Sequence, residues 1–135
     1  MCKRAIEPRY GMWTFPAGFM ENEESVSEAA ARETYEEAIA KVTGLTLYSL
    51  YSLPHINQVY VVYRAVLVEG RASPGAESLE VALMGEKDVP WQDIAFPVIR
   101  ESLEQYFEDK QKNRFSLHHG DMRRQAGHDY EIIRY

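Results

Sequence analysis

The chain has 135 residues, of which 45% are hydrophobic and 27% are charged, a composition typical of one soluble globular domain. Its formal net charge of −6 argues against nonspecific binding to nucleic acid, and no apolar run is long enough to span a bilayer. The single cysteine, Cys2, excludes an intrachain disulfide and a cysteine zinc cluster. No basic-then-apolar leader is visible, so we expect a cytoplasmic protein.

The first half of the chain predicts strands around one helix. Runs of β-forming residues and the Pro and Gly residues between them set the boundaries. The expected elements are a strand ending over residues 3–6, a turn over 7–11, a short strand over 13–15, a helix that begins after Ser25, and strands over 42–53 and 58–68.

The second half predicts a loop over residues 70–75, a strand over 80–84 and an amphipathic helix over 97–110. The apolar residues of that helix recur at helical spacing and are expected to be core. Residues 111–135 are polar and contain a candidate terminal strand over 130–135. We therefore expect one domain over residues 1–110 and a C-terminal tail, 111–135, without an assigned role.

The helix after Ser25 is well specified. Ser25 can serve as the N-cap, and Glu28 at the third helical position completes a capping box. The interior is rich in alanine, which has the highest helix propensity.

A spaced series of residues on this helix and the preceding loop carries the chemistry. It consists of Gly18, Glu24, Arg32, Glu33, Glu36 and Glu37. At about 100° per residue, Glu36 lies about 60° to one side of Glu33, and Glu37 lies about 40° to the other side. Carboxylates this close repel one another, and a hard divalent cation, Mg²⁺ or Mn²⁺, would remove that repulsion. Exposed Glu-Glu pairs alone are usually only solvated, but the full spacing favours a functional site. Arg32 is placed to pair with Glu24.

The series resembles the Nudix box of Nudix hydrolases: Gly, five residues, Glu, seven residues, Arg-Glu, an apolar residue, any residue, Glu-Glu, any residue, Gly. Two positions depart from it. Thr34 stands where an aliphatic residue is usual, and Ile39 replaces the glycine that ends the helix. The flanking stretches 4–21, 52–60, 74–80 and 94–96 resemble the ADP-ribose and FAD pyrophosphatase subgroup, without its N-terminal zinc ribbon.

The resemblance implies an α/β fold (α+β), a Nudix-type α/β/α sandwich with a mixed sheet. Nudix domains normally have a strand before the equivalent of residues 3–6, and this chain begins too late to supply it. We therefore expect the first strand to be missing or supplied by a partner chain, because an unpaired sheet edge invites pairing. On that ground we predict a homodimer.

The resemblance also implies an enzyme that cleaves a diphosphate linkage with Mg²⁺ or Mn²⁺. ADP-ribose or FAD would yield a nucleoside monophosphate and a phosphorylated remainder. The implied metal ligands are Gly18, through its backbone, with Glu33, Glu36 and Glu37, and the implied catalytic residues are Arg32, Glu33, Glu36, Glu37 and Glu80. Glu80, or with less support Glu77, stands where the family places a later-loop base. Alternatives are a Nudix enzyme acting on nucleoside triphosphates or dinucleotide polyphosphates, and a catalytically silent nucleotide-binding module.

Candidate substrate-binding residues flank the motif and start the strongest strand. They are Arg9, Tyr10, Trp13, His55 and Gln58. The Tyr10 and Trp13 rings could stack on an adenine or flavin ring, although a tryptophan here could equally pack under the sheet. Arg9 could meet a phosphate, and His55 and Gln58 could bind a base or ribose or simply cap a turn. The expected partner is a small nucleotide, with no nucleic acid and no membrane.

Overall fold

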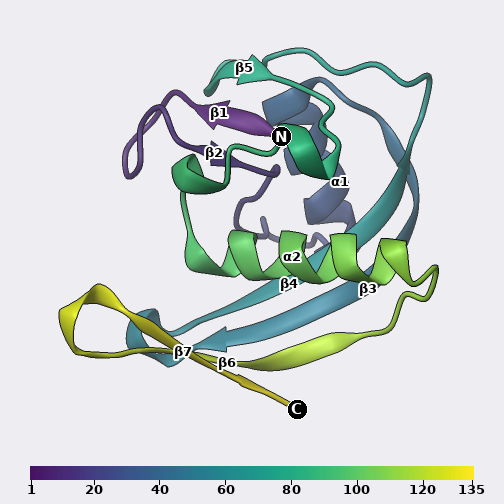
Figure 1. The fold of residues 1–135 in the computed structure, drawn as a ribbon. Coiled ribbons are helices and arrows are strands. Elements are labelled where there is room, and N and C mark those ends of the chain that lie inside the picture. The colour runs from purple at the N-terminus through teal and green to yellow at the C-terminus, as the bar shows by residue number, and fades with distance from the viewer.

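The computed structural model describes residues 1–135, and its two sheets and two helices are shown in Figure 1. The smaller sheet has the order β2 (Trp13–Thr14), β1 (Cys2–Arg4), β5 (Ser78–Val81), and both of its pairings are antiparallel. The larger sheet has the order β4 (Gln58–Leu67), β3 (Val42–Leu53), β6 (His118–Arg124), β7 (Tyr130–Arg134). It is mixed because β3 and β6 are parallel. The predicted α+β class with a mixed sheet is confirmed.

Helix α1 covers Val26–Ala38 and begins as the sequence predicts. The Ser25 side chain accepts a hydrogen bond from the Glu28 backbone N–H at 3.3 Å, and the Glu28 carboxylate accepts one from the Ser25 N–H at 2.8 Å. The helix ends at Ile39, whose φ of 45° is left-handed. Glycine adopts that conformation without steric cost, whereas Ile39 carries a penalty of about 1–2 kcal/mol.

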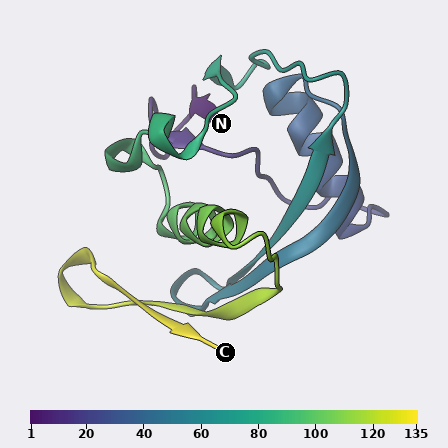
Figure 2. The same cartoon turned by 45° about the vertical axis from the view of Figure 1, so that its right-hand side comes forward.

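Helix α2 covers Pro97–Gln111 and runs beside the curved strands β3 and β4, nearly end-on in Figure 2. The main core cluster joins this helix to the larger sheet through Tyr51, Leu53, Val98, Ile99 and Met122. Short 3₁₀ turns cover Pro54–Ile56, Glu86–Asp88, Trp91–Asp93 and Ala126–His128. None of the helices is both long and apolar enough to span a bilayer.

The C-terminal segment takes part in the larger sheet. Strand β6 lies alongside β3, on the side opposite β4, and β7 pairs antiparallel with β6. Arg134 of β7 donates to the buried carboxylate of Glu101 on α2 at 2.8 and 3.0 Å. Both sides of β3 are therefore occupied within one chain.

The first strand of the chain is β1, and two elements differ most from the predictions. Strand β5 begins at Ser78 instead of residue 80, because it takes its register from β1. The sequence also did not predict β6, whose residues, HHGDMRR, are almost entirely polar.

Candidate active site

Arg32, on α1, is the centre of an acidic cluster that joins this helix to the loop before it. Its Nε and Nη2 donate to the two carboxylate oxygens of Glu24 at 2.7 and 3.0 Å, which is the pairing that the spacing predicts. Its Nη1 donates to Glu33 at 2.7 Å and to Glu36 at 3.2 Å. Nη2 also donates to the Phe19 carbonyl at 3.0 Å. One guanidinium therefore fixes the loop to the helix and orients two of the carboxylates.

The turn over residues 17–18 lies directly against two of the carboxylates of α1. The Ala17 N–H donates to Glu37 at 3.2 Å. A Cβ on Gly18 would lie 2.1 Å from the Glu33 carboxyl group, so only glycine lets the backbone approach Glu33 this closely. Glu33, Glu37 and the backbone of this turn therefore converge on one place.

The environment of Glu37 disfavours its charged form. Burial raises the pKa of Glu37 to about 7, the hydrogen bond from Ala17 lowers it, and the negative charge of Glu33 raises it. The charge of Arg4 lowers the same pKa and that of Glu77 raises it. A bound cation would stabilise the carboxylate form of Glu37.

The carboxylates are not already gathered as a set of three metal ligands. Their chemistry nevertheless fits a hard divalent cation, because the donors are carboxylate oxygens beside a close-packed backbone turn. Glu33 and Glu37 lie against that turn, and Arg32 holds Glu36 beside Glu33.

A loop over residues 70–78 packs against the C-terminal end of α1. The Gly75 N–H and the Ser78 hydroxyl donate to the Glu37 carbonyl at 3.1 and 2.7 Å. The Cys2 thiol lies 3.9 Å from the same oxygen. A Cβ on Gly75 would lie 1.7 Å from the Glu36 carbonyl oxygen, so the loop requires glycine there.

The packing of this loop distinguishes Glu77 from Glu80, the two residues that the sequence offers as the base. Glu77 lies between Gly75 and Ser78, and its charge raises the pKa of Glu37. Glu80 lies in β5 opposite Lys3, with which it forms an exposed ion pair at 3.3 Å. The backbone around Glu77 therefore lies against the end of α1, whereas the Glu80 side chain is engaged by Lys3.

The predicted substrate-binding residues do not form one group. Arg9 and Tyr10 lie exposed in the turn between β1 and β2. Trp13 is 9% exposed, which leaves little of its ring for a ligand. The His55 ring packs against Tyr130 of β7, with ring centres 5.6 Å apart, and Gln58 starts β4.

Arg4 and Tyr60, on two different strands, lie near the cluster and were not predicted. The charge of Arg4 lowers the pKa of both Glu37 and Tyr60. The alternation of β1 is the one signal that could have found Arg4, since Cys2 and Arg4 share a face of that strand.

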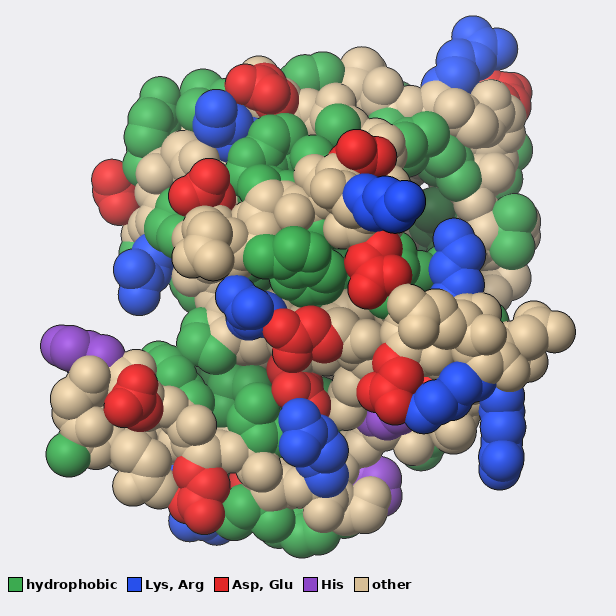
Figure 3. Space-filling model, viewed as in Figure 1, with side chains coloured by type: hydrophobic (Ala, Val, Ile, Leu, Met, Phe, Trp, Pro, Cys, Tyr) green, Lys and Arg blue, Asp and Glu red, His purple; other side chains and the backbone are tan.

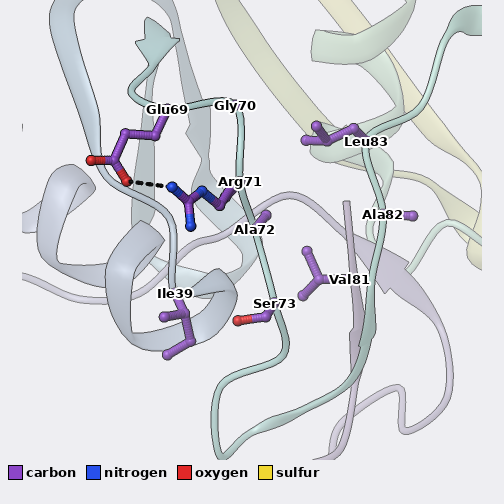
Figure 4. Close-up of a pocket in the computed structure, with 9 residues that line it drawn as sticks. All are labelled: Ile39, Glu69, Gly70, Arg71, Ala72, Ser73, Val81, Ala82 and Leu83. Carbon is purple, nitrogen blue, oxygen red and sulfur yellow. Dashed lines mark ion pairs between the residues drawn. The ribbon is translucent and has the colours of Figure 1, made fainter.

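A cavity of about 520 Å³ adjoins the far side of the same loop. Figure 4 shows it between the end of α1 and β5, lined by Ile39, Glu69, Arg71, Val81 and Leu83 among others. Acidic and basic side chains are interspersed on the face seen in Figure 3, which shows no continuous basic patch.

Comparison with known proteins agrees with this geometry. The family model for the NUDIX domain matches residues 1–106. A crystal structure of a NUDIX hydrolase from Nitrosomonas europaea is 52% identical, with a TM-score of 0.87 over 91% of this chain and 70% of that one. The Mutator MutT protein from Bacillus halodurans, 19% identical with a TM-score of 0.62 over 98% and 86% of the two chains, shares the fold. No protein of curated function matches.

Two family properties accompany this match: Nudix hydrolases act on small nucleotide substrates, and they generally use divalent cations. The box residues Glu24, Arg32 and Glu33 are joined as the motif requires, which agrees with an active enzyme. The chain therefore belongs to the Nudix hydrolase family and is a pyrophosphohydrolase.

Proposed function

We propose that this enzyme uses Mg²⁺ to hydrolyse the diphosphate linkage of ADP-ribose, FAD or a similar adenine-containing diphosphate. The products are a nucleoside monophosphate and a phosphorylated remainder. The observation that carries the proposal is the convergence of Glu33 and Glu37 on the turn at Gly18, with Arg32 orienting Glu33 and Glu36. The flanking stretches that resemble the ADP-ribose and FAD subgroup support this substrate class.

Glu33, Glu36 and Glu37 would hold the cation, together with the backbone oxygen of Gly18. When bound, it neutralises the diphosphate oxygens and lowers the pKa of a water molecule. Arg32 keeps two of these side chains in place and shields their mutual repulsion. Glu77, close to Glu37, is the carboxylate that accepts the proton of the attacking water in this proposal.

The test is a panel of ADP-ribose, FAD, a nucleoside triphosphate and a dinucleotide polyphosphate, with products separated by chromatography at saturating Mg²⁺. We expect ADP-ribose or FAD to have the highest kcat/KM. Glu37→Gln and Glu33→Gln are expected to lower kcat by about 10²–10³-fold, because each removes a charged oxygen from the cation site. EDTA should abolish turnover.

Glu86→Gln is the matched control, since this exposed acid lies in the 3₁₀ turn before Val89 and bonds only to Gln111. It should keep the wild-type kcat. A preference for the triphosphate would assign the enzyme to another Nudix substrate class. Nucleotide binding without turnover of any compound would favour the catalytically silent module and contradict the proposal.

A further inference from the structure

Gly75 to Ser78 form a closed turn that rests on the C-terminal end of α1. The Ser78 N–H donates to the Gly75 carbonyl at 3.1 Å, which is the hydrogen bond that closes a four-residue turn. Glu77 is one of the two central residues of this turn. A Cβ on Gly75 would lie 1.7 Å from the Glu36 carbonyl oxygen, so the turn is pressed directly against the helix. The position of Glu77 therefore depends on how the two ends of the turn are fixed.

One backbone oxygen of α1 fixes both ends of the turn. The Glu37 carbonyl accepts a hydrogen bond from the Gly75 N–H at 3.1 Å and another from the Ser78 hydroxyl at 2.7 Å. This carbonyl belongs to the last turn of the helix, where carbonyl groups have no partner within the helix itself. The bond from Ser78 is the shorter of the two, and its side chain is half-buried. The Ser78 hydroxyl therefore holds the end of the turn that lies next to Glu77.

Glu77 combines a fixed backbone with an unpaired carboxylate. Its carbonyl accepts a hydrogen bond from the Ala5 N–H at 3.0 Å, which ties the turn to the chain just after β1. The Glu77 side chain is exposed and forms no ion pair, whereas Glu80 pairs with Lys3. The charge of Glu77 raises the pKa of Glu37, so the two carboxylates interact. A free carboxylate on a fixed backbone suits a proton acceptor, which must stay within reach of one water molecule.

We propose that Ser78 is a positioning residue, whose hydroxyl bond to the Glu37 carbonyl holds the turn so that the Glu77 carboxylate stays within reach of the attacking water. This inference rests on the proposed function, in which Glu77 accepts the proton of that water. Without the hydroxyl, the Gly75 bond still keeps the start of the turn on α1, but the end next to Glu77 is held less firmly. Ser78 touches neither the substrate nor the cation in this assignment and acts through Glu77.

A double-mutant cycle separates this role from a purely structural one, in which the hydroxyl only stabilises the end of the helix. The cycle compares Ser78→Ala, Glu77→Gln and the double variant on the best substrate of the wild type at saturating Mg²⁺. We expect Ser78→Ala to lower kcat about 10-fold, with KM changed less than about 2-fold. In the Glu77→Gln background the same change should lower kcat less than about 2-fold, because the residue it positions is already gone. An equal loss in both backgrounds would overturn the proposal.

Three further variants control for folding and for side-chain shape. Ser78→Thr and Ser78→Val have nearly the same shape and differ in the hydroxyl, and both suit the start of a strand, so this pair serves if the alanine variant does not fold. Ser78→Thr should keep about half or more of the wild-type kcat, and Ser78→Val should lose as much as Ser78→Ala. Ser73→Ala is the matched control, because Ser73 is an exposed serine of the same loop that bonds to α1 through its backbone N–H. Its kcat should equal that of the wild type, and equal values for the Thr and Val variants would contradict the role of the hydroxyl.

Amide hydrogen exchange separates this inference from the proposed function, because it requires no turnover. In Ser78→Ala or Ser78→Val the amides of residues 75–78 should exchange about 10-fold faster than in the wild type, while those of α1 keep their rates. If ADP-ribose or FAD is hydrolysed but exchange at residues 75–78 is unchanged, the proposed function stands and the role of Ser78 is refuted. If another nucleotide is the substrate, the cycle is run with that nucleotide and decides the role of Ser78 by itself. A protein that turns over no nucleotide would refute both.

Discussion

The Glu37 carbonyl is the point where distant parts of the chain meet the box. Cys2 from β1 and the loop residues Gly75 and Ser78 all contact this oxygen. The box itself could be predicted from the sequence, because its spacing on one helix places the carboxylates without reference to the rest of the fold. Glu77 and Arg4 could not be chosen from the sequence, because their positions depend on how β1, β5 and the loop pack onto α1.

Glu77 and Glu80 provide a residue-scale prediction. Glu77→Gln should lower kcat by about 10²-fold, because it removes a carboxylate whose charge acts on Glu37. Glu80→Gln should have a smaller effect, since Glu80 pairs with Lys3 on the other face of β1. Steady-state kinetics of both variants, with thermal unfolding to confirm folding, check this order. A larger loss in Glu80→Gln would show that the proton acceptor is Glu80.

At the scale of elements, the sequence predicted those helices and strands whose bounds depend on neighbouring residues in the chain. The capping box located the start of α1, and the run of β-formers located β3 and β4. The start of β5 was displaced by two residues because pairing with β1, not propensity, sets its register. Strand β6 escaped prediction because its stability comes from its parallel neighbour β3 and not from its own polar residues.

The loop over residues 70–78 is the element whose packing can be tested most directly. Gly75→Ala should destabilise the protein by about 1–3 kcal/mol and lower activity, because the added methyl meets the Glu36 carbonyl and forces the loop off α1. Gly85→Ala is the control, since a Cβ there meets only the Asp88 carboxylate at 3.8 Å and φ is ordinary. Urea unfolding and kcat/KM of both variants provide the measurement. Equal stability of the two variants would contradict this packing.

At the scale of the whole molecule, the larger sheet has one long open edge. Strand β4 pairs only with β3, and Val59 and Val66 on it are 57% and 63% exposed. The dimer expected from the sequence stays a prediction. The sheet's two edges are β4 and β7, and the longer β4 edge is the one we expect a second copy to pair with.

Light scattering at micromolar concentration should therefore give twice the chain mass of 15.6 kDa. Val59→Lys should shift the protein toward the monomer, because it places a charge on the exposed edge. Glu86→Gln changes the net charge by the same amount and should leave the mass unchanged. A wild-type monomer would refute the dimer.

The ion pair between Glu101 and Arg134 has a consequence for biosynthesis. Glu101 leaves the ribosome 33 residues before the arginine that neutralises it, and until then α2 cannot bury its acidic side chain without a large desolvation cost. During folding, α2 therefore docks fully on the larger sheet only once β7 has brought Arg134 to the Glu101 carboxylate.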